Sequence, residues 1–180
     1  MKKLVLVAAG KDQAGIVSAI TEVLFELACN LEDTSMILLE DHFTVMMMFS
    51  PPHNQSVEAI RNALQVKTNS FGLALNLFEI DVTEERKKRA GQAWMIGVTS
   101  PDQTGIIYHV SKTLAQKNVN IYQLASRRLP NANGATLYLV SMEVDVPESV
   151  SEQEFEALLT GLAKTYGFDI QSHPLETFLL

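Results

Sequence analysis

The chain has 180 residues, 47% of them hydrophobic and 19% charged, which is the composition of a globular protein rather than of a disordered one. No uncharged apolar run reaches the roughly 18 residues that a membrane-spanning helix needs, and a net charge of −7 disfavours contact with a nucleic-acid backbone. The single cysteine, Cys29, cannot form an internal disulfide and the four histidines lack zinc-site spacing, so we expect a cytoplasmic protein with no metal or cofactor, no membrane partner and no direct nucleic-acid partner.

The first predicted element is a buried strand in the sequence KLVLVAA, residues 3–9. A secretory signal peptide would need a longer apolar run and a cleavage site, whereas Lys11 and Asp12 follow here almost at once. The second element is a helix, because six apolar residues recur at the spacing of one helical face. These residues are Ile16, Val17, Ile20, Val23, Leu24 and Leu27.

Two strands, a second helix and a last strand complete the first half of the chain. Residues 31–49 predict two strands joined at Glu40 and Asp41. An apolar stripe predicts the helix, and its members are Val57, Ile60 and Leu64. Gly72 is placed to end that helix, and residues 73–82 predict the final strand.

A short basic cluster follows, with Arg86, Lys87, Lys88 and Arg89 in the sequence TEERKKRAGQ. Short charge runs between apolar elements are usually solvated connections, so we expect residues 82–92 to be a linker. The alternative is a patch that contacts an acidic partner.

The second half of the chain repeats the first. Asp12 aligns with Asp102 at an offset of 90 residues, and Pro52 aligns with Pro147 at an offset of 95. The difference, 95 − 90 = 5, places an insertion near the turn-forming sequence PNANG at 130–134. The predicted organisation is a first unit at 1–81, a linker at 82–92, a second unit at 93–174 and a tail at 175–180.

Each unit has the order β-α-β-β-α-β, which predicts an α+β fold made of two ferredoxin-like units. In the second unit, Ser151 and Glu154 form a capping box before an apolar stripe, and Gly167 ends that helix. The stripe consists of Phe155, Leu158, Leu159 and Leu162. Each antiparallel sheet carries both helices on one face, so its other face is left bare, and the strands carry many apolar side chains, including the run Met46–Met48. Either the units pair within the chain or the chain dimerises, and the methionines could instead form a soft binding surface.

The repeated sequences GKDQAGIVSAI and SPDQTGIIYHV join the first strand of each unit to its first helix. Asp12 and Asp102 are expected at the helix N-cap, with Gly15 and Gly105 inside the first turn. A glycine there would let a ligand approach the backbone, and the free N–H groups of a helix N-terminus favour an anion. The alternative is a capped helix without a ligand.

A repeated asparagine follows each first helix, at Asn30 and Asn120. Its amide both donates and accepts hydrogen bonds, as recognition of a zwitterionic amino acid requires. The alternative is a turn residue with left-handed backbone.

The sequences GKDQAGIV with CNLED, and SPDQTGII with VNIYQ, resemble the ACT domain, and the tandem resembles the glycine cleavage system transcriptional repressors. The resemblance implies amino-acid binding at the seam between two ACT units whose sheets join side by side. Carried over, the ligand-binding residues are Asp12, Gln13, Ala14, Gly15 and Asn30 in the first unit and Asp102, Gln103, Thr104, Gly105 and Asn120 in the second. Many ACT loops have proline where Ala14 and Thr104 stand, and only the second copy has Pro101, so the two sites need not be equal.

The resemblance implies a homodimeric, non-catalytic regulator that binds an amino acid such as glycine or serine and modulates a protein partner, such as a transcriptional activator. The alternative is an ACT regulatory subunit or fragment associated with a metabolic enzyme such as formyltetrahydrofolate deformylase. No nucleophile and base are paired in the sequence, since Cys29 and His109 are both expected to be structural. RNA recognition, which also uses this fold, would need paired aromatics on the central strands and a basic surface.

Overall fold

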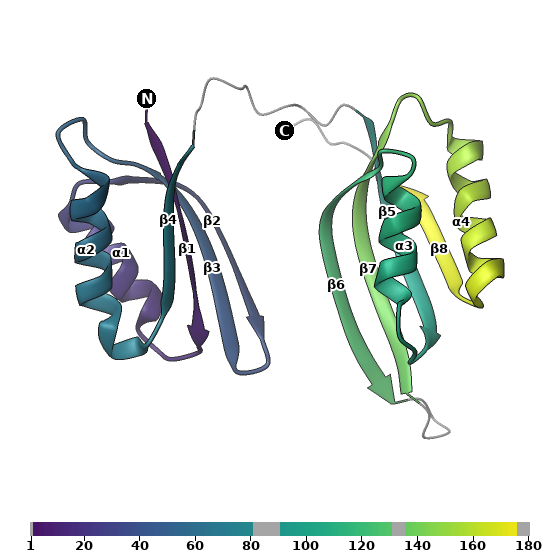
Figure 1. Cartoon of the computed structure of the whole chain (residues 1–180), viewed down its shortest axis with the longest axis horizontal. Coiled ribbons are helices and arrows are strands. Elements are labelled where there is room, and N and C mark those ends of the chain that lie inside the picture. The colour runs from purple at the N-terminus through teal and green to yellow at the C-terminus, as the bar shows by residue number, and fades with distance from the viewer. Residues whose placement is uncertain (1, 81–90, 131–135, 176–180) are drawn as a thin grey trace. The chain divides into compact units, whose positions relative to one another are not determined.

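The computed structural model describes residues 2–80, 91–130 and 136–175 (Figure 1). The chain divides into two compact units, residues 1–86 and 87–180. The basic cluster at 86–89 and most of the insertion expected at 130–134 lie outside the described residues, as do most of the expected linker and residues 176–180 of the expected tail. Gly91 and Gln92, which were expected in that linker, belong to the first strand of unit 2.

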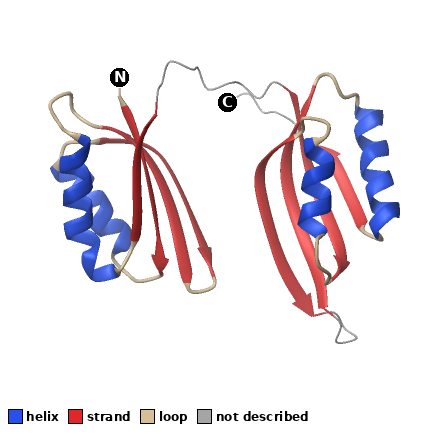
Figure 2. Cartoon of the chain, in the orientation of Figure 1, coloured by secondary structure: helices blue, strands red, loops and turns tan. Residues whose placement is uncertain are grey.

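Both units have the predicted β-α-β-β-α-β order (Figure 2). Unit 1 consists of β1 (Lys3–Lys11), α1 (Ile16–Glu26), β2 (Asn30–Leu39), β3 (His42–Ser50), α2 (Val57–Thr68), a short 3₁₀ helix (Asn69–Phe71) and β4 (Ala74–Ile80). Unit 2 consists of β5 (Gly91–Pro101), α3 (Ile106–Ala115), β6 (Asn120–Pro130), β7 (Thr136–Pro147), α4 (Glu152–Tyr166) and β8 (Asp169–Pro174). The sheet orders are β2-β3-β1-β4 and β6-β7-β5-β8, all antiparallel, with both helices of a unit on one face. The fold is therefore α+β with two ferredoxin-like units, as the sequence predicts.

The core of unit 1 lies between the sheet and its two helices. Alternate residues of β1 and β3 point to the helices, and most of the predicted apolar face of α1 meets them. Val17 is the exception, because 40% of this residue remains exposed. The members of this core cluster from the three elements are Leu4, Leu6, Ala8, Phe43, Val45, Met47, Phe49, Ile16, Ile20, Val23 and Leu24.

The core of unit 2 has the same layout and larger side chains. Trp94 on β5 and Phe155 on α4 meet edge to face, with their ring centroids 5.2 Å apart. Leu159 and Leu162 bury the same face of α4. Gly167 ends this helix with a φ of 70°, as predicted. Gly72 ends the 3₁₀ helix that follows α2 with a φ of 64°, whereas α2 itself has its C-cap at Asn69, three residues before the predicted cap.

The predicted capping box at the start of α4 is formed. The Glu154 amide donates to Ser151 Oγ at 3.3 Å, and the Ser151 amide donates to Glu154 Oε2 at 3.0 Å. The backbone hydrogen bond from Ser151, followed by that from its hydroxyl, holds the pKa of the Glu154 carboxyl below its ordinary value.

This capping box makes a testable contribution to the pH dependence of stability. A lowered carboxyl pKa stabilises the folded state above the ordinary pKa of the unfolded chain, and this stabilisation is lost as the pH falls through the lowered value. We expect the Glu154 carboxyl, followed by NMR, to titrate below the ordinary value of a glutamate side chain. In Glu154→Gln the unfolding free energy should change less across that acidic range than in the wild type. If the free energy of unfolding depended on pH in the same way in Glu154→Gln and in the wild type, the capping box would not contribute to acid sensitivity.

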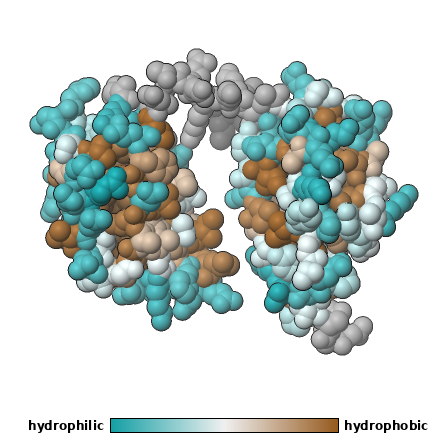
Figure 3. Space-filling view, viewed as in Figure 1, coloured by the Kyte–Doolittle hydropathy of each residue, from teal (hydrophilic) through white to brown (hydrophobic). Residues whose placement is uncertain are grey.

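The open faces of the two sheets differ in chemistry. In unit 1 the register places Val5, Met46, Met48 and Phe78 together on the face away from the helices, whereas Met47 is buried in the core. Figure 3 shows a broad hydrophobic area on unit 1. In unit 2 the corresponding face is mixed, because Glu143, Gln171 and His173 lie beside the apolar Met95 and Leu139. The apolar open face expected of both units is therefore more pronounced in unit 1, where Met46 and Phe78 are exposed.

Candidate functional site

The loop that leads into the first helix of each unit is built around a left-handed glycine. Gly15 and Gly105 are the N-cap residues of α1 and α3, with φ values of 97° and 90°. The expectation that Asp12 and Asp102 are N-caps is wrong, because the helices begin four residues later and no side chain caps them. Glycine is required because other L-residues rarely adopt this backbone conformation.

The two aspartates instead extend the sheet through their backbones. The Asp12 amide donates to the Asp41 carbonyl at 2.8 Å, and the Asp102 amide donates to the Thr136 carbonyl at 3.0 Å. The backbone of each loop is thus fixed at the end of the central strand, and both aspartate residues are exposed. Beyond each loop, the first amides of the helix have no carbonyl partner within that helix, so they can face a ligand.

Close approach to the backbone is a second constraint at only one of the two glycines. A Cβ on Gly15 would lie 3.8 Å from Phe71 Cζ, an ordinary contact, whereas a Cβ on Gly105 would lie 3.2 Å from the ring of His109. The left-handed backbone alone explains why position 15 is a glycine. At position 105 both the left-handed backbone and the nearby His109 ring favour glycine.

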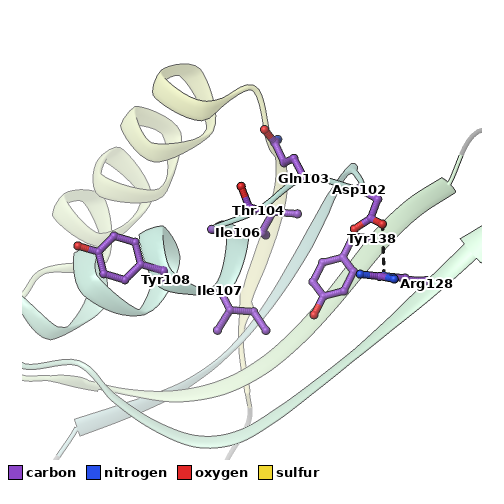
Figure 4. Close-up of a pocket in the computed structure, with 9 residues that line it drawn as sticks. Asp102, Gln103, Thr104, Ile106, Ile107, Tyr108, Arg128 and Tyr138 are labelled. Carbon is purple, nitrogen blue, oxygen red and sulfur yellow. Dashed lines mark ion pairs between the residues drawn. The ribbon is translucent and has the colours of Figure 1, made fainter.

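In unit 2 this loop borders a cavity of about 460 Å³ (Figure 4). The cavity brings together four of the predicted site residues with part of α3 and with two side chains from the neighbouring strands. Its lining is Asp102, Gln103, Thr104, Gly105, Ile106, Ile107, Tyr108, Arg128 and Tyr138. Arg128 on β6 and Tyr138 on β7 were not predicted from the sequence.

The polar groups of the cavity form specific contacts. Arg128 Nε lies 3.3 Å from Asp102 Oδ2, and Figure 4 shows the two side chains facing one another beside the ring of Tyr138. The Tyr138 hydroxyl donates to Ser126 Oγ at 2.8 Å. Gln103 Nε2 donates to the buried Ser100 hydroxyl at 2.9 Å, which ties this predicted ligand residue to the protein itself. The lining of the cavity therefore includes one cation, one anion, two phenols and the hydroxyl of Thr104.

Asn30 and Asn120 are separated from these loops within each unit. They are the first residues of β2 and β6, and Asn120 lies opposite Asp145, which in turn lies opposite Ala93. The loop begins after Pro101, eight residues farther along β5, which corresponds to about 27 Å of strand. One unit alone does not bring its asparagine to its own loop.

The alternative that these asparagines are left-handed turn residues is wrong, since both begin strands. The left-handed residues before them are Ala28, with a φ of 53°, and Asn118, with a φ of 55°.

The corresponding loop of unit 1 has different surroundings. The counterparts of Arg128 and Tyr138 in the repeat are Leu38 and Phe43, which pair with each other in the same register. Near this loop, Asp41 contacts Lys11 Nζ at 4.0 Å and His42 Nδ1 at 2.8 Å. The two loops share a backbone form, but only the loop of unit 2 has an arginine at this place.

Cys29 and His109 have structural surroundings. Burial raises the pKa of the Cys29 thiol, which disfavours the reactive thiolate. The ring of His109 stacks on that of Tyr166, with the centroids 4.0 Å apart. Within the described ranges, no three or more His, Cys, Asp or Glu side chains are grouped so that they could hold a metal ion, and no helix is long and apolar enough to cross a membrane.

Comparisons with known proteins indicate the family of the chain. Residues 2–77 match the family model of the ACT domain. Over 164 residues the chain is 28% identical to the glycine cleavage system transcriptional repressor of Escherichia coli, covering 88% of this chain and 85% of that protein. It is also 32% identical over 75 residues to a UPF0237 protein of Streptococcus pneumoniae, covering 42% of this chain and 81% of that protein.

Solved structures resemble the whole chain in fold. One is a protein of unknown function from Galdieria sulphuraria, with a TM-score of 0.82, 24% identity and coverage of 98% of this chain and 100% of that one. Another carries the provisional description of a glycine cleavage system transcriptional repressor, with a TM-score of 0.74, 15% identity and coverage of 98% of both chains.

Proposed function

We propose that this chain, which belongs to the ACT-domain family, is a non-catalytic regulatory protein that binds an amino acid such as glycine or serine in the cytoplasm. In this proposal the bound amino acid changes how the protein contacts a protein partner, such as a transcriptional activator. The similarity to the E. coli repressor, which extends over 88% of the chain, supports a role in transcriptional regulation.

The observation that carries the proposal is the position of each loop relative to the asparagine on the edge strand. The loop and the asparagine of one unit lie at opposite ends of its sheet. An antiparallel partner strand would reverse that order and bring the asparagine of one ACT unit next to the glycine loop of another. Edge strands β2 and β6 have exposed residues along most of their length, as such pairing requires. A homodimer supplies the partner strand.

Thermal unfolding of the full chain against the twenty amino acids tests the proposal. A ligand present at 100 times its dissociation constant should stabilise the folded state by about 2.7 kcal/mol, and glycine and serine are the first candidates. Acetate and methylamine, which carry one charged group of glycine each, serve as controls for salt and pH effects. If none of the twenty amino acids raises the melting temperature above these controls, the proposed function is wrong.

A further inference from the structure

We propose that the ion pair between Asp102 and Arg128 is the part of unit 2 that recognises the amino acid, and that a zwitterionic ligand opens it. The ligand carboxylate binds the Arg128 guanidinium, and the ligand ammonium binds the Asp102 carboxylate. This inference rests on the proposed function and assigns its ligand site to unit 2. It also defines the ligand class, which must carry both charges.

The geometry allows this exchange. The Asp102 and Arg128 side chains are 31% and 70% exposed, and both line the cavity. An ion pair exposed to water contributes little to stability, so replacing it with two ligand contacts costs little. The guanidinium presents a planar fork of donors that matches a carboxylate.

The charge of the site selects the ligand class. The charges of the Asp102 and Arg128 side chains sum to zero, as do the two charges of a free amino acid at neutral pH. A carboxylic acid without an amino group would pair with Arg128 and leave the Asp102 carboxylate close to a like charge. An amine without a carboxylate would leave Arg128 without its anion. Only a zwitterion satisfies both side chains, and Ile107 provides an apolar wall beside them.

Unit 1 shows that the glycine loop alone does not supply this chemistry. Asp12, Gln13 and Gly15 repeat the loop, but the position of Arg128 is occupied by Leu38 and that of Tyr138 by the buried Phe43. The two copies therefore differ on the strands beside the loop, where unit 2 has a charge and a hydroxyl that unit 1 lacks.

Calorimetric titration of the full chain with each of the twenty amino acids provides the test, with Arg128→Leu as the variant because leucine is the residue of unit 1. Arg127→Leu is the matched control. It removes the same charge one residue away, and Arg127 pairs with Leu139 on the opposite face of the sheet. Arg128→Leu should weaken binding of the best amino acid by about 10- to 100-fold, and Arg127→Leu should change it by less than about twofold.

A second variant tests the other charge. Asp102→Asn should weaken binding of the amino acid at least tenfold and strengthen binding of the same acid without its amino group, because the repelling carboxylate is gone. Equal affinities of Arg128→Leu and the wild type, or of the amino acid and its deaminated form, would overturn this inference and leave the proposed function standing. If the wild type binds none of the twenty amino acids, the proposed function and this inference both fail.

Discussion

Replacing Phe155 with alanine should lower the free energy of unfolding of unit 2 by about 3–5 kcal/mol. Phe155 is fully buried and packs against Trp94, so its removal loses apolar burial and leaves a cavity that the sheet and helices cannot fill completely. A domain of this size is stable by about 5–15 kcal/mol, so the variant should approach the limit of folding. Trp94 is the single tryptophan of the chain, so its fluorescence during urea unfolding reports on unit 2 alone.

Phe25→Ala is the matched control, because the chemical change is identical while Phe25 is 83% exposed on α1. Its counterpart in the repeat, Ala115, already is alanine. We expect a change within about 0.5 kcal/mol for this variant, measured by circular dichroism because Trp94 lies in the other unit. If Phe155→Ala and the wild type unfolded at similar urea concentrations, the position of Phe155 in the core would be contradicted.

The order of elements could be predicted because each element has a local pattern. The apolar runs of β1 and β3, the stripes of α1 and α4 and the capping box at Ser151 each depend on a few consecutive residues. The start of α1 and α3 was misplaced because Asp12 and Asp102 have the residue type of an N-cap. Their backbone amides instead donate to carbonyls at the end of the neighbouring strand, which no local pattern reveals.

The candidate site could be predicted only on its loop side. The repeat of Asp-Gln-x-Gly identifies Asp102 and Gly105, but Arg128 and Tyr138 reach the cavity only through the register of β6 and β7. A signal for them was present in the repeat itself. Where the two copies are aligned, an arginine replaces Leu38 and a tyrosine replaces Phe43, so polar groups stand where the other copy has apolar ones. Such differences between copies indicate a site that has diverged within a shared fold.

Gly105→Ala should destabilise unit 2 by about 1–3 kcal/mol, because alanine is strained at a φ of 90°. The new Cβ would also lie 3.2 Å from the His109 ring, which would have to shift against Tyr166. Gly161→Ala is the matched control in the same unit. Gly161 lies inside α4, and an added Cβ would have no heavy atom within 4 Å. The free energy of unfolding of this variant should therefore rise by about 0.5–1 kcal/mol.

Comparison of Gly105→Ala with Gly161→Ala thus distinguishes the cost of backbone strain from the effect of adding a methyl group. The unfolding of both variants in urea can be followed by Trp94 fluorescence. A third variant, Gly105→Asn, should be less destabilised than Gly105→Ala, because asparagine tolerates the left-handed conformation better than other side chains. If the two Gly105 variants were equally unstable, contact with His109 rather than backbone strain would be the dominant cost. Unfolding stability of Gly105→Ala equal to that of the wild type would contradict the left-handed backbone at the N-cap of α3.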